Sequence, residues 1–281
     1  DKIDFSNLTF NAFSRDEWIN DNDSRFNIFG NENIRSIINK IQLKGKPLEE
    51  FVLTSLGITP YDKYQGHTEE LIKNKEFHAK EKLNENYVPL ISGKNIHRYH
   101  ISNEVRDYLN YGDWLGAPRE RKFFENKKII VRQIVGGKNL DIIAGYSEHP
   151  NYFTQIGFSL ISKSNDNEEL KFLLALLNSR LISFYHKNKF LDTEKLLFQK
   201  ILIANCKKLP ILKAKNQKVF IVLIDNIIAL KKENPQSDTT ALEQQIDNLV
   251  YKLYDLTYDE VKVVDPAFAL SEEEYNNIVI E

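Results

Sequence analysis

Cations, amides and aromatic rings recur together in a few short stretches of this chain, and side chains of these types bind nucleic acid. In the stretch from Tyr87 to Tyr99, an apolar run predicts a buried strand. Ser92-Gly93 then breaks the run, because glycine adopts backbone angles that other residues avoid. Lys94, Arg98 and Tyr99 follow at once. A strand that delivers such side chains to a turn is suited to contact phosphates and base edges.

A second stretch, residues 60–67, is rich in Pro and Gly, which predicts a loop. It carries two tyrosines, a lysine, a glutamine and a histidine. These side chains could contact nucleic acid by stacking and through amide or cation contacts. The alternative interpretation is an ordinary surface loop with aromatic side chains.

Motifs of several other functions are missing. We find no Gly-rich phosphate loop, no methyl-donor loop and no nucleophile elbow. His97 and His100 would share a helix face if that stretch were helical, but a metal site needs further ligands. Asp113 with Glu120-Arg121-Lys122 has the letter pattern of a metal-dependent nuclease, yet it lies in a segment rich in Pro and Gly, which offers no rigid scaffold for an ion. We therefore predict no catalytic residue and no metal ligand.

The charge of the chain is unevenly distributed. Residues 41–215 hold 28 Lys and Arg against 20 Asp and Glu, a net charge of +8, whereas residues 216–281 hold 5 against 13, a net charge of −8. A basic segment beside an acidic one is expected of a polyanion-binding surface with a non-binding support. Fluctuation of charge along the chain is the alternative.

Length and composition limit the class of protein. The 281 residues are 42% hydrophobic, enough for a substantial core in one or two domains. No apolar run is long enough to cross a bilayer. The single cysteine, Cys206, excludes an internal disulfide and fits a reducing compartment. Because the chain starts at Asp1 and contains no methionine, we expect a fragment or an incompletely written sequence.

The apolar periodicities predict an α+β fold. Apolar and β-branched runs predict strands at 48–59, 87–91, 127–133, 140–146 and 152–161. Apolar residues at steps of three and four predict helices at 31–43, 168–188, 219–232 and 240–254. Thr257 and Ser271 begin capping boxes of two short helices, and residues 1–25 are expected to be irregular and docked by aromatic rings. Short strands between glycine turns favour a mixed, mostly antiparallel sheet, followed by a helical C-terminal lobe.

Taken in order, several segments resemble the TaqI-like C-terminal specificity domain, the target recognition part of adenine-specific DNA methyltransferases in type II and IIG restriction-modification systems. The matching segments are 57–67, 87–99, 127–133, 174–185, 209–211 and 246–257. The resemblance implies that the chain reads a short sequence in double-stranded DNA and presents it to a methyltransferase domain upstream in the same chain. It also implies a cytoplasmic protein of a prokaryote, with S-adenosylmethionine used by the absent catalytic domain and no cofactor in this fragment.

The charge distribution and the predicted elements favour a division of the chain. We expect an N-terminal docking segment and helix at 1–45, a recognition lobe at 46–212 and a helical support lobe at 213–281. The alternatives are the specificity subunit of a multi-subunit restriction system, a protein-interaction module without a DNA role, and a self-contained metal nuclease.

Two sets of residues are candidates for DNA contact, because Arg and Lys pair with guanine and Asn and Gln with adenine. The candidate base readers or close backbone contacts are Lys63, Tyr64, His67, Lys94, Arg98, Arg132 and Gln133. The candidate phosphate contacts are Arg119, Arg121, Lys122, Lys127, Lys128 and Lys138. For each, a solvated surface charge is the alternative. Arg180 is instead expected to brace the fold through a buried hydrogen bond.

Overall fold

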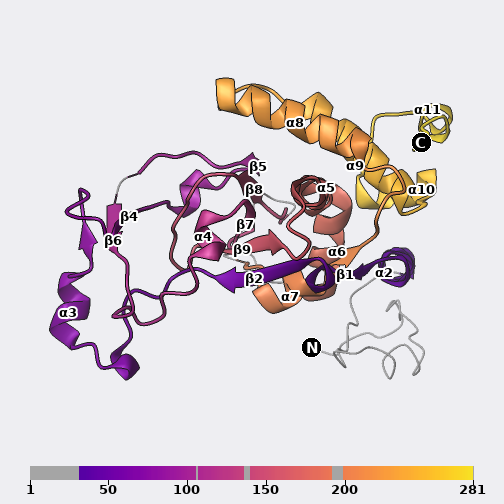
Figure 1. Cartoon of the computed structure of the whole chain (residues 1–281). Helices are drawn as coiled ribbons and strands as arrows, with labels where there is room; N and C mark the ends of the chain where they lie inside the picture. Colours follow the sequence, from indigo (N-terminus) through magenta and orange to yellow (C-terminus); the bar gives the residue numbers. More distant parts are fainter. Residues whose placement is uncertain (1–31, 106, 136–139, 192–198, 281) are drawn as a thin grey trace, which may run out of the picture.

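A five-stranded sheet forms the centre of the molecule (Figure 1). The computed structural model describes residues 32–105, 107–135, 140–191 and 199–280. The strand order is β2 (Val52–Leu56), β9 (Gly157–Ser162), β7 (Lys128–Arg132), β8 (Ala144–Ser147) and β5 (Tyr99–His100). The first four strands pair antiparallel, and only β5 runs parallel to its neighbour β8. The predicted α+β fold with a mixed, mostly antiparallel sheet is therefore confirmed, as is the hairpin of β7 and β8.

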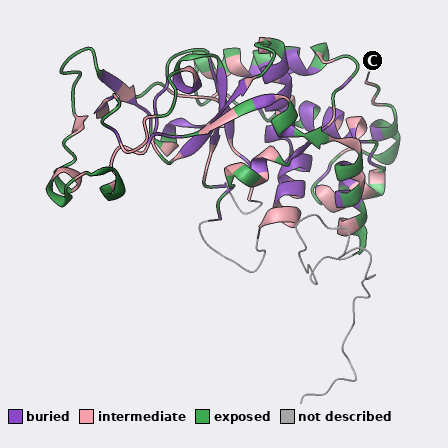
Figure 2. Cartoon of the chain, turned by 60° about the horizontal axis from the view of Figure 1, so that its bottom comes forward, coloured by how far each residue is buried: buried purple, intermediate pink, exposed green. Residues whose placement is uncertain are grey.

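A smaller sheet lies to one side of the first. Its strands are β3 (His78–Ala79), β6 (Asp107–Asn110) and β4 (Tyr87–Leu90). With α3 (Glu69–Asn74), which buries no residue, this sheet forms the exposed end of the molecule at the left of Figures 1 and 2. The segment from Tyr87 to Tyr99 therefore begins in the small sheet and ends in the large one.

Gly145 allows β5 to reach the large sheet. A Cβ atom at this position would lie 2.6 Å from the carbonyl oxygen of His100, closer than real Cβ contacts come. Because glycine has no Cβ, the two strands can pair here in the register Tyr99 to Gly145. This pairing fixes the position of residues 97–100.

The predicted helix at 168–188 is wrong in one respect, since it consists of two helices. Helix α5 (Asn167–Asn178) ends and α6 (Arg180–Phe190) begins at Ser179, whose hydroxyl accepts a hydrogen bond from the Ile182 amide at 3.2 Å. Such a cap satisfies an amide at the start of the new helix. The apolar spacing continues across Ser179, so periodicity alone does not reveal the break.

The other helices agree with the sequence. They are α2 (Glu32–Lys44), α8 (Lys218–Glu233), α9 (Thr240–Leu253), α10 (Tyr258–Val264) and α11 (Glu272–Asn276). Both predicted capping boxes are present, at Thr257 and at Ser271. Short elements complete the fold: β1 (Lys46–Pro47), α4 (Lys122–Glu125), α7 (Ile203–Lys207), β10 (Pro210–Ile211), and the 3-10 turns η1 (Leu48–Glu50), η2 (Lys63–Gln65) and η3 (Gly93–Asn95).

One large core packs the five-stranded sheet against α2, which precedes it in the sequence, and against helices that follow it. Ile41 of α2, Val131 of β7, Leu173 of α5, Ile224 of α8 and Tyr275 of α11 are all fully buried in it. A second cluster lies under the small sheet and α4. The predicted boundaries at 45 and 212 stay predictions; β1 pairs with β10, so the two ends of the recognition lobe lie side by side.

Two further sequence predictions concern other parts of the chain. Residues 1–25, predicted to dock through aromatic rings, lie outside the described residues. Within the described part of the chain, no helix has both the length and the apolar composition for crossing a membrane.

Candidate nucleic-acid interface

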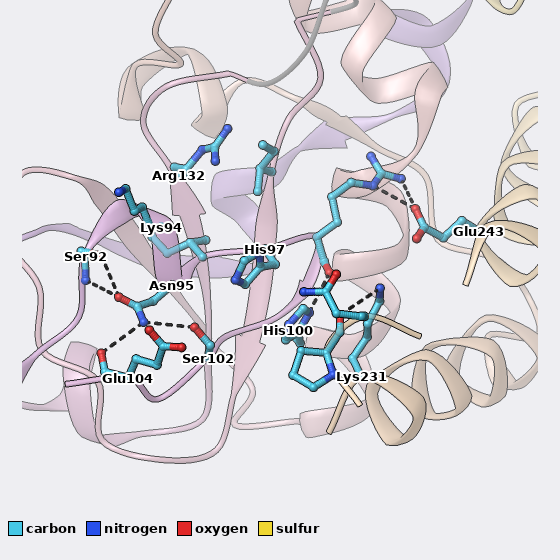
Figure 3. Close-up of a pocket in the computed structure, with 15 residues that line it drawn as sticks. Ser92, Lys94, Asn95, His97, His100, Ser102, Glu104, Arg132, Lys231 and Glu243 are labelled. Atoms are coloured by element: carbon cyan, nitrogen blue, oxygen red, sulfur yellow. Dashed lines mark hydrogen bonds and ion pairs between the residues drawn. The ribbon is translucent and has the colours of Figure 1, made fainter. Parts of the chain in front are cut away.

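An open cavity of about 660 Å³ lies where the segment from Ser92 to Glu104 faces the turn between α8 and α9 (Figure 3). Lys94, Arg98 and Arg132 line it from the recognition lobe, and Lys231 and Gln236 line it from the helical lobe. Three of the seven candidate base readers therefore meet at one cavity.

Asn95 gives the segment beside Lys94 its shape. Its side-chain oxygen accepts hydrogen bonds from the amide and hydroxyl of Ser92 at 2.7 and 2.8 Å. Its amide nitrogen donates to the Ser102 hydroxyl and to the Glu104 carbonyl oxygen at 3.0 and 3.2 Å. Because Asn95 is only 5% exposed, these bonds hold the loop in place while Lys94 stays exposed to solvent.

Arg98 and Tyr99 attach the segment to the helical lobe. The Arg98 guanidinium pairs with the Glu243 carboxylate of α9 at 2.9 Å and lies 5.3 Å from the centre of the Tyr99 ring. Tyr99 is 1% exposed and has a φ of 70°, in the left-handed region that bulky residues avoid. Strain of this kind persists only where the surroundings enforce it. Here the burial of Tyr99 and the ion pair of Arg98 enforce it.

His97 and His100 stack beside these residues, with ring centres 4.7 Å apart and planes inclined by 8°. Burial lowers the pKa of both rings. The pKa of His97 is lowered further by Arg132 and Lys231, and that of His100 by the neighbouring His97 ring and Lys231. Their stretch is not helical, and among the described residues no three His, Cys, Asp or Glu side chains gather as a metal site.

The remaining candidate readers differ in position. Arg132 donates from Nε to the Ile134 carbonyl oxygen at 2.9 Å, and burial lowers its pKa. Gln133 follows it and bonds through its backbone to Ile156 and Ile201.

Lys63, Tyr64 and His67 lie on and beside η2, outside the cavity. The Tyr64 side chain is 85% exposed, with the Lys63 ammonium 5.0 Å from its ring centre. Both ring nitrogens of His67 bond within the fold, to the Asp62 amide at 3.1 Å and to the Trp114 carbonyl oxygen at 2.9 Å. His67 thus holds the loop that presents Tyr64.

Four candidate phosphate contacts gather around α4 and carry local partners. Arg121 donates to Glu125 and to the Tyr152 hydroxyl at 3.2 and 3.1 Å, and its guanidinium lies 4.6 Å from the centre of the Tyr111 ring. Lys122 pairs with Glu120 at 2.7 Å and Lys127 with Glu148 at 3.3 Å. Arg119 is exposed with a φ of 68°, and its carbonyl oxygen accepts a hydrogen bond from Tyr111. All four stay predictions.

The prediction that Lys128 contacts a phosphate is wrong. Its side chain is 0% exposed, and its ammonium donates to the carbonyl oxygens of Asn126 and His149 at 3.1 and 2.7 Å. A group enclosed in this way does not reach a phosphate. The prediction failed because both faces of β7 are buried. Successive side chains point to opposite faces, but neither face is exposed to solvent at the start of this strand. Lys138 lies outside the described residues.

Arg180 braces the fold, as predicted. Its guanidinium pairs with Asp265 at 2.8 Å and Asp247 at 3.3 Å, and its amide donates to Asp247 at 2.8 Å. Both carboxylates are buried, although the arginine side chain itself is half exposed.

The sequence analysis did not identify Lys231 and Gln236, which line the cavity opposite the segment from Ser92 to Glu104. The pair of lysines just before the Asn234-Pro235 turn was the pattern that could have indicated them.

Comparison with known proteins gives matches that concern restriction-modification proteins. A protein of Methanocaldococcus jannaschii whose name describes a type II restriction enzyme and methyltransferase is 26% identical over 188 residues, 66% of this chain but 16% of that protein. Two solved structures are 13% identical: the HsdS subunit from Thermoanaerobacter tengcongensis (TM-score 0.37, 79% of this chain) and the type I restriction-modification S subunit from M. genitalium (TM-score 0.35, 85% of this chain). The match spans 51% and 55% of those two chains.

The family described as the TaqI-like C-terminal specificity domain matches residues 88–211. This range contains the segment from Ser92 to Glu104, the strands β5, β7, β8 and β9, and the Asn178-Ser179-Arg180 helix break. The resemblance inferred from the sequence is therefore confirmed over residues 88–211, which match the TaqI-like C-terminal specificity domain, whereas the segments at 57–67 and 246–257 lie outside the matched range.

Proposed function

We propose that this chain recognises a short sequence in double-stranded DNA, as the target recognition domain of a restriction-modification N6-adenine DNA methyltransferase. The observation that carries the proposal is the specificity-domain match at residues 88–211, with three candidate readers of that range around the cavity it forms with the turn between α8 and α9. Cationic side chains on a rigid loop suit contacts with phosphates and with guanine edges.

Catalysis belongs to the rest of the proposed parent protein. The chain spans only 16% of the length of its relative from Methanocaldococcus jannaschii. In the proposal, an upstream domain binds S-adenosylmethionine and takes the target adenine out of the duplex. The lobe described here holds the remaining bases of the site, and a nuclease activity would reside in a further part of the parent.

A selection from a pool of random duplexes tests the proposal with the 281-residue chain. The expected result is enrichment of one short sequence, with binding that weakens steeply as salt rises, because phosphate contacts release counterions. Binding that ignores salt and enriches no sequence would contradict the proposal and favour a protein-interaction module. Magnesium-dependent cleavage by this chain would favour the nuclease.

Substitutions at Arg98 and at its partner Glu243 can distinguish a role in reading a base from a purely structural role. As a reader, Arg98→Ala should relax the preference at one base pair, a discrimination of about 1–3 kcal/mol. Glu243→Gln breaks the same ion pair but leaves the guanidinium in the cavity, so it should keep the base preference. Binding of the selected duplex and of its single-base variants measures both effects.

The same pair of variants identifies the alternative role. If both substitutions lower the melting temperature alike and neither changes the preference among bases, Arg98 only fastens the loop to α9.

A further inference from the structure

The helical lobe carries a net negative charge, yet it supplies a cation to the cavity. We infer that the cavity binds one backbone phosphate of the DNA duplex, held jointly by Lys94, Arg132 and Lys231, so that the helical lobe takes part in the DNA contact. The inference rests on the proposed function and gives the helical lobe a role that its charge did not predict.

Three separate elements place these cations around one cavity. Lys94 belongs to η3, Arg132 ends β7, and Lys231 lies in the last turn of α8. In Figure 3, Lys94 and Arg132 lie on one side of the His97 ring and Lys231 lies on the other side, beyond His100. Convergence of like charges on one cavity is unfavourable unless an anion occupies it.

The carboxylates of the cavity do not balance these cations. Four cationic side chains and two carboxylates line it. Glu243 is occupied by the ion pair with Arg98 at 2.9 Å, which leaves Glu104 against the three remaining cations. The excess positive charge favours an anionic ligand, and DNA offers phosphates at regular intervals.

Lys231 is held at the cavity wall by its own loop. Its ammonium donates to the carbonyl oxygens of Ser237 at 2.7 Å and of Pro235 at 3.5 Å. A lysine ammonium has three protons, so at least one remains for an anion after these two bonds. The loop therefore positions the charge before a ligand arrives, which reduces the ordering cost of binding.

The histidine stack makes the site sensitive to pH. His97 faces Arg132, Lys231, Glu104 and His100, and His100 faces His97, Lys231 and the Arg98 carbonyl oxygen. Burial and the cations lower the pKa of both rings. A bound phosphate would offset the cations and raise the pKa of His97 again. Because the bound state then holds the proton more tightly than the free state, affinity for DNA should rise as pH falls.

Two adjacent lysines provide a matched test. Lys231 lines the cavity, whereas Lys232 is exposed and not among the lining residues, and both lie in the last turn of α8 with the same effect on the helix dipole. Binding of a fluorescent duplex to the full chain should weaken about threefold to tenfold in Lys231→Gln, equally for all sequences. The salt slope should fall by about one. Lys232→Gln should leave the slope unchanged, and Lys231→Arg should restore the affinity.

The outcomes separate this inference from the proposed function. If the wild-type chain binds no duplex at any salt concentration, the proposed function fails. If it binds and Lys231→Gln behaves like Lys232→Gln, only the phosphate site fails. As a second readout, His97→Gln should remove the gain in affinity between about pH 7.5 and about pH 6. A gain that persists in this variant would overturn the role of His97.

Discussion

Replacing Asn178 with alanine should lower the free energy of unfolding by about 1.5–4.5 kcal/mol. The side chain is 0% exposed at the end of α5. Its oxygen accepts a hydrogen bond from the Ala144 amide at 3.0 Å, and its nitrogen donates to the Ala144 carbonyl oxygen at 2.9 Å. Alanine would leave the buried Ala144 amide without this partner, which costs about 1–3 kcal/mol, and would remove one bond to the Ala144 carbonyl oxygen, which costs about 0.5–1.5 kcal/mol. Urea denaturation measures the loss.

Asn188 is a suitable control for this substitution. Its side chain is half-buried and donates to a carbonyl oxygen of its own helix, that of Phe184, at 2.8 Å. Asn188→Ala should change the free energy of unfolding by less than about 1 kcal/mol, because water can replace the lost partner. Equal losses in the two variants would show that the bond to β8 has no special importance.

The effect of Asn178 should extend to the cavity. Asn178 docks α5 on Ala144 of β8, and β8 in turn pairs with β5, which carries His100. The same substitution should therefore weaken duplex binding in proportion to the loss of stability, without altering which sequence is preferred. A change in preference would contradict this structural role.

Lys128 should make the protein more stable as the solution becomes alkaline. Burial lowers the pKa of this ammonium from 10.5 to about 7. Between these two values the unfolded chain binds more protons than the folded chain, so the free energy of unfolding rises with pH. From about pH 7 to about pH 9 the gain from this one group should be about 2 kcal/mol. Denaturant titrations at several pH values measure it.

The neighbouring lysine is the control for this prediction. Lys127 has a side chain 53% exposed and pairs with Glu148 on the surface. Lys127→Met should keep the rise in stability between the two pH values, whereas Lys128→Met should abolish it. If stability climbs as steeply in Lys128→Met as in the wild type, the buried ammonium is not the cause.

The sequence could predict elements whose signals are local. β-Branched runs at 127–133 and apolar steps at 219–232 and 240–254 correspond to β7, α8 and α9. The capping boxes at Thr257 and Ser271 form as predicted, because each requires only residues three positions apart. The break at Ser179 escaped prediction because its apolar neighbours keep the spacing of a continuous helix. The side-chain bond of Asn178 to β8 and the ion pair of Arg180 with Asp247 of α9 hold the two helices at that point.

By itself, the sequence determined the α+β class, the basic character of residues 41–215 beside the acidic residues 216–281, and the resemblance of residues 88–211 to the specificity-domain family, since composition, periodicity and ordered motifs are properties of the chain alone. Only the tertiary structure decided the surroundings of each charged side chain. Lys128 lies beneath the surface, Arg98 meets Glu243 across 145 positions of sequence, and Lys231 reaches the cavity from the acidic lobe. Burial and ion pairing depend on groups that are distant in the chain, so no local pattern encodes them.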